Sequence, residues 1–527
     1  MTAQTTEKSL NKRVAEVIEE NRARVTVLAV LLFLFLAAFA GLEREDWFAV
    51  IMQGLSIGAI TFLVASGLSL IFGLMDVLNL AHGEIFMLGA YVGWTVYTRF
   101  DTALDIVIPL LFLAAPFVVM PVWRKVSGRL PTDPTPRRVA SWALLAVGAV
   151  VTWMTVTRFP LAIWDSGDFT QSPGNFSTQV GLGILAPLTP DTFQGAAVVA
   201  VVGLLIGGSL LAIGISAFQT HVGEIRPVTR RQVGTAATLI VAAIVLSVFK
   251  DSLNQWAFDL STTWRFFLAM AISVGVGVAL GAFIEVLLIR PLYDRPIYQL
   301  MLTLGVGFIL IEVVRDVWGR PEFSMARPAL FNGTGEGCPG QGLGGFFSGC
   351  STVQVFGARL RVYNEGFVIL VGLIVLVGVT MLLKRTRIGM IIRAGVQDPD
   401  MVEVLGINVR RVFTLVFALG CGLAALGGVL AAPSIGLSTG MGALFLLGAL
   451  IAMAIGGLTS FPGAAAGAVL VGLLQTLIIR FGQVGINIPF LAEPFEPSPT
   501  LVPAASIILM VIVLLVLPSG LFGRGER

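Results

Sequence analysis

The sequence predicts an all-α polytopic membrane protein. Of its 527 residues, 56% are hydrophobic and only 12% are charged, whereas about a quarter of the residues in a soluble protein are charged. Apolar runs of about 17 to 25 residues recur along the chain, and each is long enough as a helix to cross a hydrocarbon core of about 30 Å. These runs do not alternate between polar and apolar residues as barrel strands do, so we expect helices.

We expect about fourteen membrane-spanning helices. In chain order they are predicted at residues 25–41, 47–73, 84–99, 104–122, 139–158, 195–219, 234–249, 265–289, 297–318, 365–383, 411–431, 441–457, 462–480 and 500–518. The first run ends in Ala38-Phe-Ala40, which resembles a cleavage site, but acids and bases are mixed in the residues before it. We therefore expect a retained anchor helix and not a signal peptide.

The basic residues predict the orientation. If the N-terminus is cytoplasmic and the spans alternate, the basic loops at 124–138, 226–231, 290–295, 384–393 and 524–527 all lie inside, as the positive-inside rule requires. Both termini are then cytoplasmic, and the loops at 159–194 and 319–364 lie outside. The net charge of +3 carries no further information about partners.

Three cysteines are too few for a Cys-rich metal cluster, and we expect neither a metal nor a cofactor. Cys338 and Cys350 share the glycine-rich outer loop, where a disulfide can form in an oxidising compartment and contribute about 3 kcal/mol. The alternative is two unpaired cysteines in that loop. Cys421 lies in an apolar span and is expected to serve packing.

A short polar break follows the second predicted span. It runs Gly73-Leu-Met-Asp-Val-Leu-Asn79-Leu-Ala-His82-Gly83-Glu84 between two long apolar runs. Non-helical backbone at membrane depth needs a protein or water environment, so Asn79, His82 and Glu84 are candidates for a translocation path or gate. The other interpretation is an interfacial turn in which Asn79 and His82 cap helix ends and Glu84 lies in a first turn.

A second polar segment covers residues 384–411. Within it, Asp398 to Val404 predicts a short helix, with Pro399 at its first position and Gly406 after its end. Met401, Val404 and Leu405 would give this helix an apolar side that suits a partner protein. A solvated basic loop that only sets the topology is the alternative, and the pattern does not separate the two.

Several function classes are excluded by what the sequence lacks. It has no P-loop motif, no His-x-x-x-His, no nucleophile elbow, and only two histidines, so we do not expect an enzyme. The sequence also lacks a basic patch with interleaved aromatic residues, so we do not expect nucleic-acid binding.

Glycines one turn apart, such as Gly54 with Gly58 and Gly463 with Gly467, predict closely packed helices.

Two segments together carry a resemblance to a known family. Asn79-Leu-Ala-His-Gly-Glu-Ile-Phe-Met-Leu-Gly-Ala-Tyr91 and the run from Arg387-Ile-Gly389 to Leu405-Gly-Ile-Asn-Val-Arg-Arg411 resemble the permease subunits of bacterial ABC importers for branched-chain amino acids. Urea and short-amide permeases are near relatives. The similarity divides the chain into an N-terminal segment with its anchor (1–46), a first core part (47–99), an inserted group of about four spans (100–262) and a second core part (263–527).

The resemblance implies partners and residue roles. Residues 384–411 would be the coupling loop that seats on a cytoplasmic ATPase subunit, with Arg393, Ala394, Gly395, Asp398, Met401, Gly406 and Ile407 at the matching positions. A second permease subunit and an extracytoplasmic solute-binding protein, docking on residues 319–364, would complete the importer in the bacterial inner membrane. Asn79, His82, Gly83 and Glu84 remain the candidates for the path or gate.

The resemblance implies transport of branched-chain or related amino acids. Urea or short amides are an alternative substrate class. A different mechanism is an ion-coupled secondary transporter, in which Asp76, Glu84 or Glu285 would be intramembrane ion sites.

Overall fold

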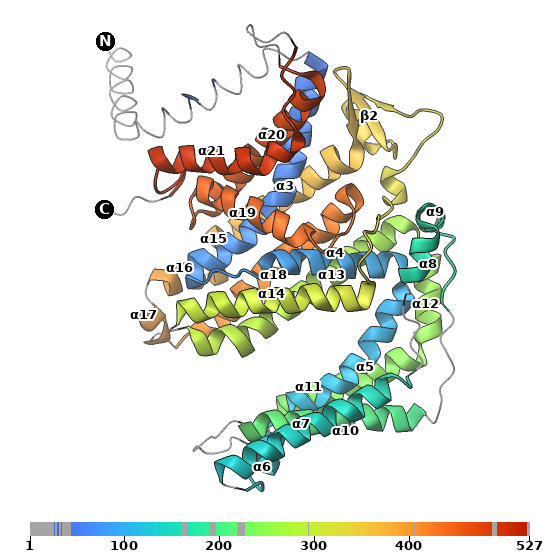
Figure 1. Ribbon diagram of the computed structural model, residues 1–527, viewed down its shortest axis with the longest axis vertical. Coiled ribbons are helices and arrows are strands. Elements are labelled where there is room, and N and C mark those ends of the chain that lie inside the picture. Colours follow the sequence, from blue (N-terminus) through green and yellow to red (C-terminus); the bar gives the residue numbers. More distant parts are fainter. Residues whose placement is uncertain are drawn as a thin grey trace. The chain divides into compact units, whose positions relative to one another are not determined.

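Helices dominate the computed structural model of the protein (Figure 1). The structure describes residues 44–131, 133–159, 164, 166–188, 197–218, 227–293, 295–397, 399–404, 406–486 and 493–523, together with four single positions before residue 44. Most of the predicted N-terminal segment and anchor, the last four residues and Asp398 therefore lie outside the described residues. The chain divides into two compact units, one formed by Met1–Trp94 with Phe266–Arg527 and the other by Thr95–Arg265.

The first unit contains most of the long helices. They are α3 (Arg44–Met75), α4 (His82–Thr98), α13 (Thr262–Ile284), α14 (Pro296–Trp318), α15 (Ile369–Arg385), α16 (Arg387–Gln397), α17 (Pro399–Val404), α18 (Val409–Ile435), α19 (Met441–Gly456), α20 (Phe461–Val484) and α21 (Val502–Val516). Short π-helical turns, η1 (Glu285–Ile289) and η5 (Val362–Val368), continue α13 and precede α15. Helix α3 packs against α18, α19 and α20.

Glycines let α3 and α20 approach closely. A Cβ atom on Gly58 would lie 3.0 Å from the Ala468 carbonyl oxygen, and a Cβ atom on Gly54 would lie 2.7 Å from the Leu473 side chain. Gly463 in turn lies against the backbone of Gly456 in α19. The predicted role of these glycines in close packing is confirmed, because any side chain would push the helices apart.

Helix α4 begins inside the bundle and not at its end. It packs on α18, with Gly89 against Ala425 and Gly93 against Val429. Its first residue, His82, lies beside Gly67, well before the end of α3 at Met75. The chain therefore folds back along α3 through residues 76–81 before α4 starts.

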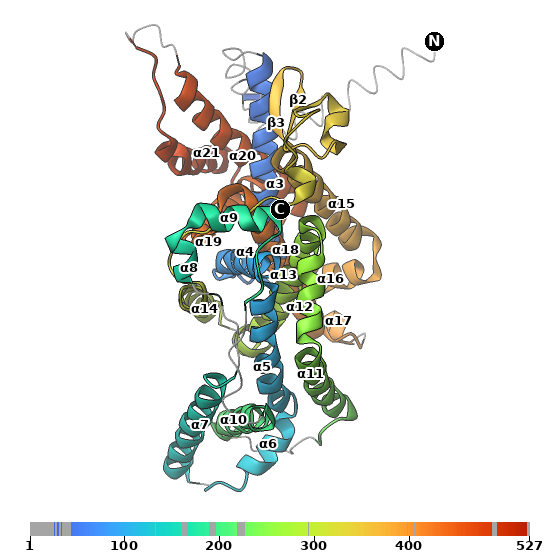
Figure 2. The same cartoon turned by 90° about the vertical axis from the view of Figure 1, so that its right-hand side faces the viewer.

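One end of the first unit carries a small sheet, which lies beside the start of α3 in both views (Figures 1 and 2). Strands β1 (Gly340–Gln341), β2 (Thr352–Val355) and β3 (Ala358–Arg361) pair in that order, with Val355 opposite Ala358 across the turn. The turn residues Phe356 and Gly357 both have positive φ, as a tight hairpin requires. Phe48 of α3 packs on Phe356 with ring centroids 5.4 Å apart.

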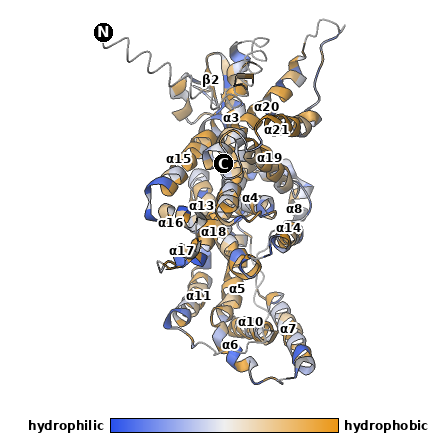
Figure 3. Cartoon of the chain, turned by 90° about the vertical axis from the view of Figure 1, so that its left-hand side faces the viewer, coloured by the Kyte–Doolittle hydropathy of each residue, from blue (hydrophilic) through white to orange (hydrophobic). Residues whose placement is uncertain are grey.

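The loop before the sheet is held in two ways. Cys338 and Cys350 form a disulfide with Cα atoms 5.6 Å apart, the pairing that the sequence predicted. Phe323 and Leu437 exchange two backbone hydrogen bonds of 3.0 and 2.8 Å, which join this loop to the segment before α19. Helices α16 and α17 lie toward the opposite end of the unit, and hydrophilic residues are prominent on them in Figure 3.

The second unit is a helical bundle with its own core. It contains α5 (Phe100–Val118), α6 (Met120–Ser127), α7 (Pro134–Val156), α8 (Ser166–Gln171), α9 (Pro173–Leu182), α10 (Ala197–Phe218), α11 (Arg230–Val248) and α12 (Lys250–Asp259). Buried Ile108, Phe112, Leu204 and Ala243 form its hydrophobic core. Lys250 is 2.5 Å from the buried carboxylate of Asp105, so this intramembrane charge has a partner.

The predicted polytopic all-α class is confirmed. Eleven described helices are long and apolar enough to cross a membrane, and α4 and α19, with 17 and 16 residues, are shorter. The first predicted span falls mostly outside the described residues, so the count of fourteen stays a prediction. The sheet and the short helices α6, α8, α9 and α12 were not predicted.

Candidate functional site

Asn79 organises the turn before α4. Its Oδ1 atom accepts a hydrogen bond of 3.1 Å from the Ala81 N–H, and its Nδ2 lies 4.0 Å from the Cys421 sulfur in α18. The N–H of Leu80 donates to the Thr303 hydroxyl of α14 at 3.2 Å. Asn79 thus takes the turn-forming role of the structural interpretation, although it is fully buried.

His82 is completely buried between α3 and α18. A Cβ atom on Gly67 would lie 2.7 Å from its Nε2 atom and 2.5 Å from the Gly420 carbonyl oxygen, so glycine makes room for the imidazole. The Val64 carbonyl lies near the ring, and neither ring nitrogen makes a hydrogen bond of good geometry to any residue that the structure describes. A buried polar atom without a partner is costly, which marks this position as more than a helix cap.

Gly83 and Glu84 meet the start of α19. Gly83 contacts the Gly442 backbone, and a Cβ atom on Gly442 would lie 3.0 Å from the Glu84 Oε2 atom. Glu84 is only 8% exposed, and its Oε2 atom has no hydrogen-bond partner among the described residues. On the other side of Glu84 lies Gly307 of α14. A Cβ atom on Gly307 would lie 3.7 Å from the Glu84 side chain, which is an ordinary contact distance.

Two helix N-termini therefore lie together inside the bundle. The first N–H groups of α4 and α19 carry partial positive charge, and the Glu84 carboxylate lies in the first turn of α4. Together with His82, this arrangement places donors and acceptors at a depth where the surrounding helices are apolar. Broken helices that meet in this way suit the binding of a polar solute in transit.

The predicted coupling loop, residues 384–411, contains the predicted short helix. Helix α17 spans Pro399–Val404, and Gly406 follows it with φ of 80°. Met401 and Val404 are 58% and 82% exposed, whereas Val402 is buried. The helix therefore presents apolar surface outward, as the docking interpretation requires.

The remaining predicted coupling residues lie around α17. Arg393 is exposed and its Nε donates to the Gly389 carbonyl at 3.3 Å. Ala394 and Ile407 are partly buried, Gly395 is buried and Gly406 is exposed. Asp398 lies outside the described residues. Helix α16 contacts both α3 and α18, so this segment packs on the helices that enclose His82.

Glu285, a buried carboxylate near this segment, has structural partners that the sequence did not predict. Glu285 is fully buried and pairs with Arg290 at 3.0 Å, and it accepts hydrogen bonds from Thr414 at 2.6 Å and from Tyr293. Burial, then the hydrogen bond and charge of Glu285, raise the pKa of Tyr293 above its ordinary range. Because three donors satisfy Glu285, it is occupied as a structural pair and not free to bind an ion.

The other ion-site candidates differ in setting. Asp76 is exposed, whereas Glu84 is buried and its Oε2 atom has no hydrogen-bond partner within the described ranges. Among the residues that the structure describes, no group of three His, Cys, Asp or Glu side chains could hold a metal ion.

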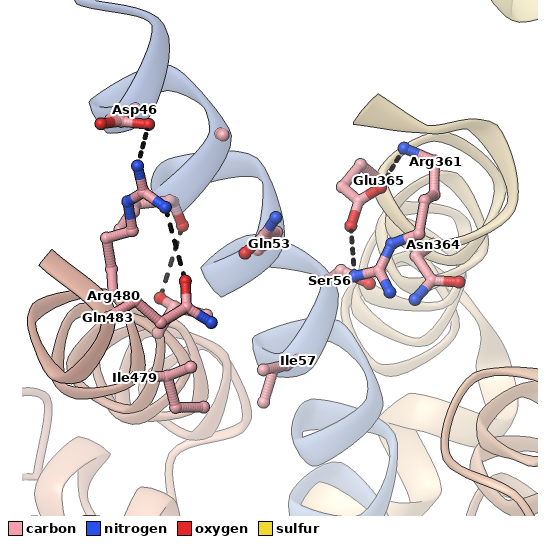
Figure 4. Close-up of a pocket in the computed structure, with 13 residues that line it drawn as sticks. Asp46, Gln53, Ser56, Ile57, Arg361, Asn364, Glu365, Ile479, Arg480 and Gln483 are labelled. Carbon is pink, nitrogen blue, oxygen red and sulfur yellow. Dashed lines mark hydrogen bonds and ion pairs between the residues drawn. The ribbon is translucent and has the colours of Figure 1, made fainter. Parts of the chain in front are cut away.

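A cavity of about 420 Å³ opens near the sheet end of the first unit. Its charged residues form two pairs, Asp46 with Arg480 and Arg361 with Glu365 (Figure 4). Next to the second pair, burial and the charge of Arg361 lower the pKa of Arg327. The sequence analysis missed this cavity, since its residues come from three distant segments.

Comparison with known proteins identifies the family. The family described as branched-chain amino acid transport system / permease component matches residues 50–121 and 228–518, which is more than half of the chain. Residues 122–227, with α7 and α10, lie outside the match, a shorter stretch than the predicted insertion at 100–262.

Individual relatives have similar names. The chain is 27% identical over 276 residues to the high-affinity branched-chain amino acid transport system permease protein LivH of Salmonella typhimurium, covering 51% of this chain and 78% of the relative. It is 30% identical over 260 residues to BraD of Pseudomonas aeruginosa, another permease protein of such a system, covering 49% and 75%. It is also 29% identical over 262 residues to the galactose/methyl galactoside import permease protein MglC of Escherichia coli, covering 49% and 70%.

No solved structure matches the chain. The family match extends over both core parts, including the turn before α4 and the segment around α16 and α17. The chain belongs to the branched-chain amino acid transport system permease component family.

Proposed function

We propose that the chain is the membrane-embedded permease subunit of an ATP-driven importer and forms part of the path by which a branched-chain amino acid enters the cell. The names of LivH and BraD support the substrate class. The structural observation that carries the proposal is the buried start of α4, where polar atoms of His82 and Glu84 have no hydrogen-bond partner in the described part of the chain. A passing solute can supply those missing partners.

The four candidate residues Asn79, His82, Gly83 and Glu84 have three roles in this proposal. Asn79 fixes the turn, and Gly83 allows α19 to start against α4. His82 and Glu84 offer the polar atoms that the solute meets. Alternating access, and not bond making, is the reaction, so the chain carries out transport without being an enzyme.

The path is tested with Glu84→Gln in the complete importer reconstituted in proteoliposomes. Removing a charged hydrogen-bonding group at a binding site costs roughly 1.5–3 kcal/mol, so we expect leucine uptake to fall about tenfold or more. Glu312→Gln is the matched control, because Glu312 is 62% exposed in its ion pair with Arg315. Uptake by Glu84→Gln equal to the control would contradict the role.

The substrate class is tested by competition. Leucine, galactose and urea are added in excess to uptake of each labelled compound. Displacement by leucine supports the proposal, whereas preference for galactose would support the second candidate, a sugar permease, which the similarity to MglC favours. Uptake that survives ATP depletion but collapses with the proton gradient would indicate an ion-coupled transporter.

We propose that the segment 384–411 couples the chain to a separate cytoplasmic ATPase. The exposed apolar side of α17 and the packing of α16 on α3 and α18 support this role. A tagged chain should co-purify with an ATPase subunit and a second permease subunit in mild detergent. Charge reversals at Arg393 and Asp398 should remove the ATPase and leave the chain in the membrane, and retention of the ATPase would contradict the assignment.

We also propose a bacterial inner-membrane location with both termini cytoplasmic. The start of α3 and the disulfide loop lie at one end of the first unit, with α16 and α17 toward the other, which supports the predicted sidedness. The extracytoplasmic solute-binding protein would dock on residues 319–364. A single cysteine introduced at Ser351 should react with an impermeant thiol reagent in intact cells, whereas one at Arg393 should react only after lysis.

A further inference from the structure

The cavity at the sheet end is enclosed by three segments that are far apart in the sequence. Helix α3 contributes Asp46 and Gln53, the η5 region contributes Arg361 and Glu365, and α20 contributes Arg480 (Figure 4). Its volume of about 420 Å³ lies within the range of small-molecule sites, about 300–1,000 Å³. The predicted orientation places this cavity on the extracytoplasmic side.

On the wall formed by Arg361 and Glu365, Arg361 has more hydrogen-bond donors than its bonds to Glu365 use. The Glu365 side chain is 1% exposed, and it receives hydrogen bonds from the Arg361 backbone N–H at 2.5 Å and from its Nη2 at 3.1 Å. Arg361 is 45% exposed, and among the described residues its guanidinium bonds only through Nη2. The other guanidinium N–H groups can hold a carboxylate in a bidentate manner.

The opposite wall carries both signs of charge. Arg480 pairs through Nη2 with Oδ1 of Asp46, and its Nη1 donates to the Gln483 side chain at 3.4 Å. Its Nε atom is buried and has no hydrogen-bond partner among the residues that the structure describes. Asp46 is 29% exposed, and its Oδ2 atom, which pairs with no described residue, can accept from a ligand ammonium group.

Apolar side chains complete the lining. Val50, Ile57 and Ile479 border the cavity together with the charged residues. A ligand that matches this lining has a carboxylate, an ammonium group and a small aliphatic part. A sugar has no charge to match either pair.

We propose that this cavity is a substrate-receiving site that binds the zwitterion of a small aliphatic amino acid on the extracytoplasmic side, before the substrate reaches His82 and Glu84. The guanidinium of Arg361 holds the carboxylate, Asp46 holds the ammonium group, and Ile57 and Ile479 contact the aliphatic side chain. Arg480 positions Asp46 and supplies its free Nε donor. This inference rests on the proposed amino-acid import and adds a second site to it.

The test uses the complete permease–ATPase complex without the binding protein, with labelled leucine as the probe in a scintillation proximity assay. Competitors are leucine, 3-methylbutylamine, which lacks the carboxylate, and 4-methylpentanoate, which lacks the ammonium group. The variants are Arg361→Gln and Arg480→Gln. Arg315→Gln is the matched control, because it breaks an exposed ion pair of 2.7 Å with Glu312.

We expect excess leucine to displace the probe and the two half-ligands to displace it at least about tenfold less well, because each forfeits one charge-assisted interaction. Arg361→Gln and Arg480→Gln should weaken leucine binding about tenfold or more, and Arg315→Gln less than about twofold. If Arg480→Gln lowers the melting temperature more than the control does, the double variant Asp46→Asn/Arg480→Gln is used in place of the single variant. The double variant does not leave the Asp46 carboxylate without its partner Arg480.

The outcomes separate the two proposals. Variants that bind and transport leucine like Arg315→Gln overturn the receiving site, while their intact uptake leaves the proposed function standing. A wild-type complex that, supplied with its binding protein, imports galactose and not leucine overturns the proposed substrate and the zwitterion site with it. Equal displacement by leucine and by either half-ligand also overturns the zwitterion site.

Discussion

The imidazole of His82 occupies the space that a side chain at Gly67 would need. A Cβ atom on Gly67 would lie 2.7 Å from Nε2 and 2.8 Å from Cε1 of the ring. The same Cβ atom would meet the Gly420 carbonyl oxygen at 2.5 Å. Gly67 therefore determines both how closely α3 approaches α18 and where the histidine lies.

Gly67→Ala should destabilise the protein and impair transport. The added methyl group must displace backbone or the buried ring, and overpacking of this kind costs about 1–3 kcal/mol. We expect a melting temperature about 1–3 °C lower in detergent and reduced uptake. Gly305→Ala is the control, because a Cβ atom there meets nothing within 4 Å, and equal behaviour of the two variants would contradict the packing argument.

Met401→Asp/Val404→Asp should weaken binding of the ATPase subunit. Burial of each apolar side chain contributes about 1.5–3 kcal/mol, so their loss should reduce association more than tenfold. Quantitative co-purification in mild detergent measures the effect. Leu343→Asp is the control, because Leu343 is also exposed, at 69%, but lies in the loop near the sheet. Undiminished ATPase recovery with the double variant would place the docking surface elsewhere.

Tyr293 should make the protein sensitive to alkaline pH. Because its pKa is raised in the folded protein, the unfolded chain loses the phenolic proton first, and the free energy of unfolding falls as the pH rises above about 10. The loss is at most about 1.4 kcal/mol per pH unit. Below that pH this contribution is fully present.

Melting temperatures between pH 7 and 11 measure this effect. Tyr293→Phe should decline less steeply above pH 10 than the wild type does, although it is less stable at pH 7 because Glu285 loses a donor. Tyr298→Phe, at a position that is 58% exposed, should follow the wild-type curve. Parallel curves for Tyr293→Phe and the wild type would refute the assignment.

Cys338→Ala/Cys350→Ala should loosen the loop near the sheet. The disulfide closes a sequence separation of 12 residues, and cross-linking a loop of this size contributes about 3 kcal/mol by chain entropy. We expect faster proteolytic cleavage within residues 319–361 in folded protein. Reductant added to the wild type should produce the same acceleration, and an unchanged cleavage rate in both cases would show that the backbone hydrogen bonds of the sheet and of Phe323 with Leu437 hold the loop without the disulfide.

Local signals allowed the sequence to predict much of this fold. Long apolar runs identified the spanning helices. Pro399 and Gly406 located α17, because the residues at which a helix begins and ends depend on neighbouring residues in the sequence. The hairpin at Phe356 and Gly357 was missed, although the alternating residues of β2 and β3 on either side of Gly357 were a usable signal. The predicted polar turn was found where expected, at the start of α4.

Long-range pairing could not be predicted. Asp46 and Arg480 are 434 positions apart, and Glu285 meets Thr414 across 129 positions. No local pattern joins such residues, so neither the cavity nor the Glu285 cluster was visible. The sequence likewise placed His82 near apolar spans but gave no indication that Gly67 faces it.

The two hydrogen bonds between Phe323 and Leu437 tie the loop before the sheet to the chain that leads into α19. Only the few residues from Leu437 to Gly442 separate this tie from the contact with Gly83. A chain segment so short cannot take up much slack, since each residue spans at most about 3.5 Å. A displacement of the loop before the sheet would therefore reach the start of α19 beside Gly83 without the unfolding of a helix.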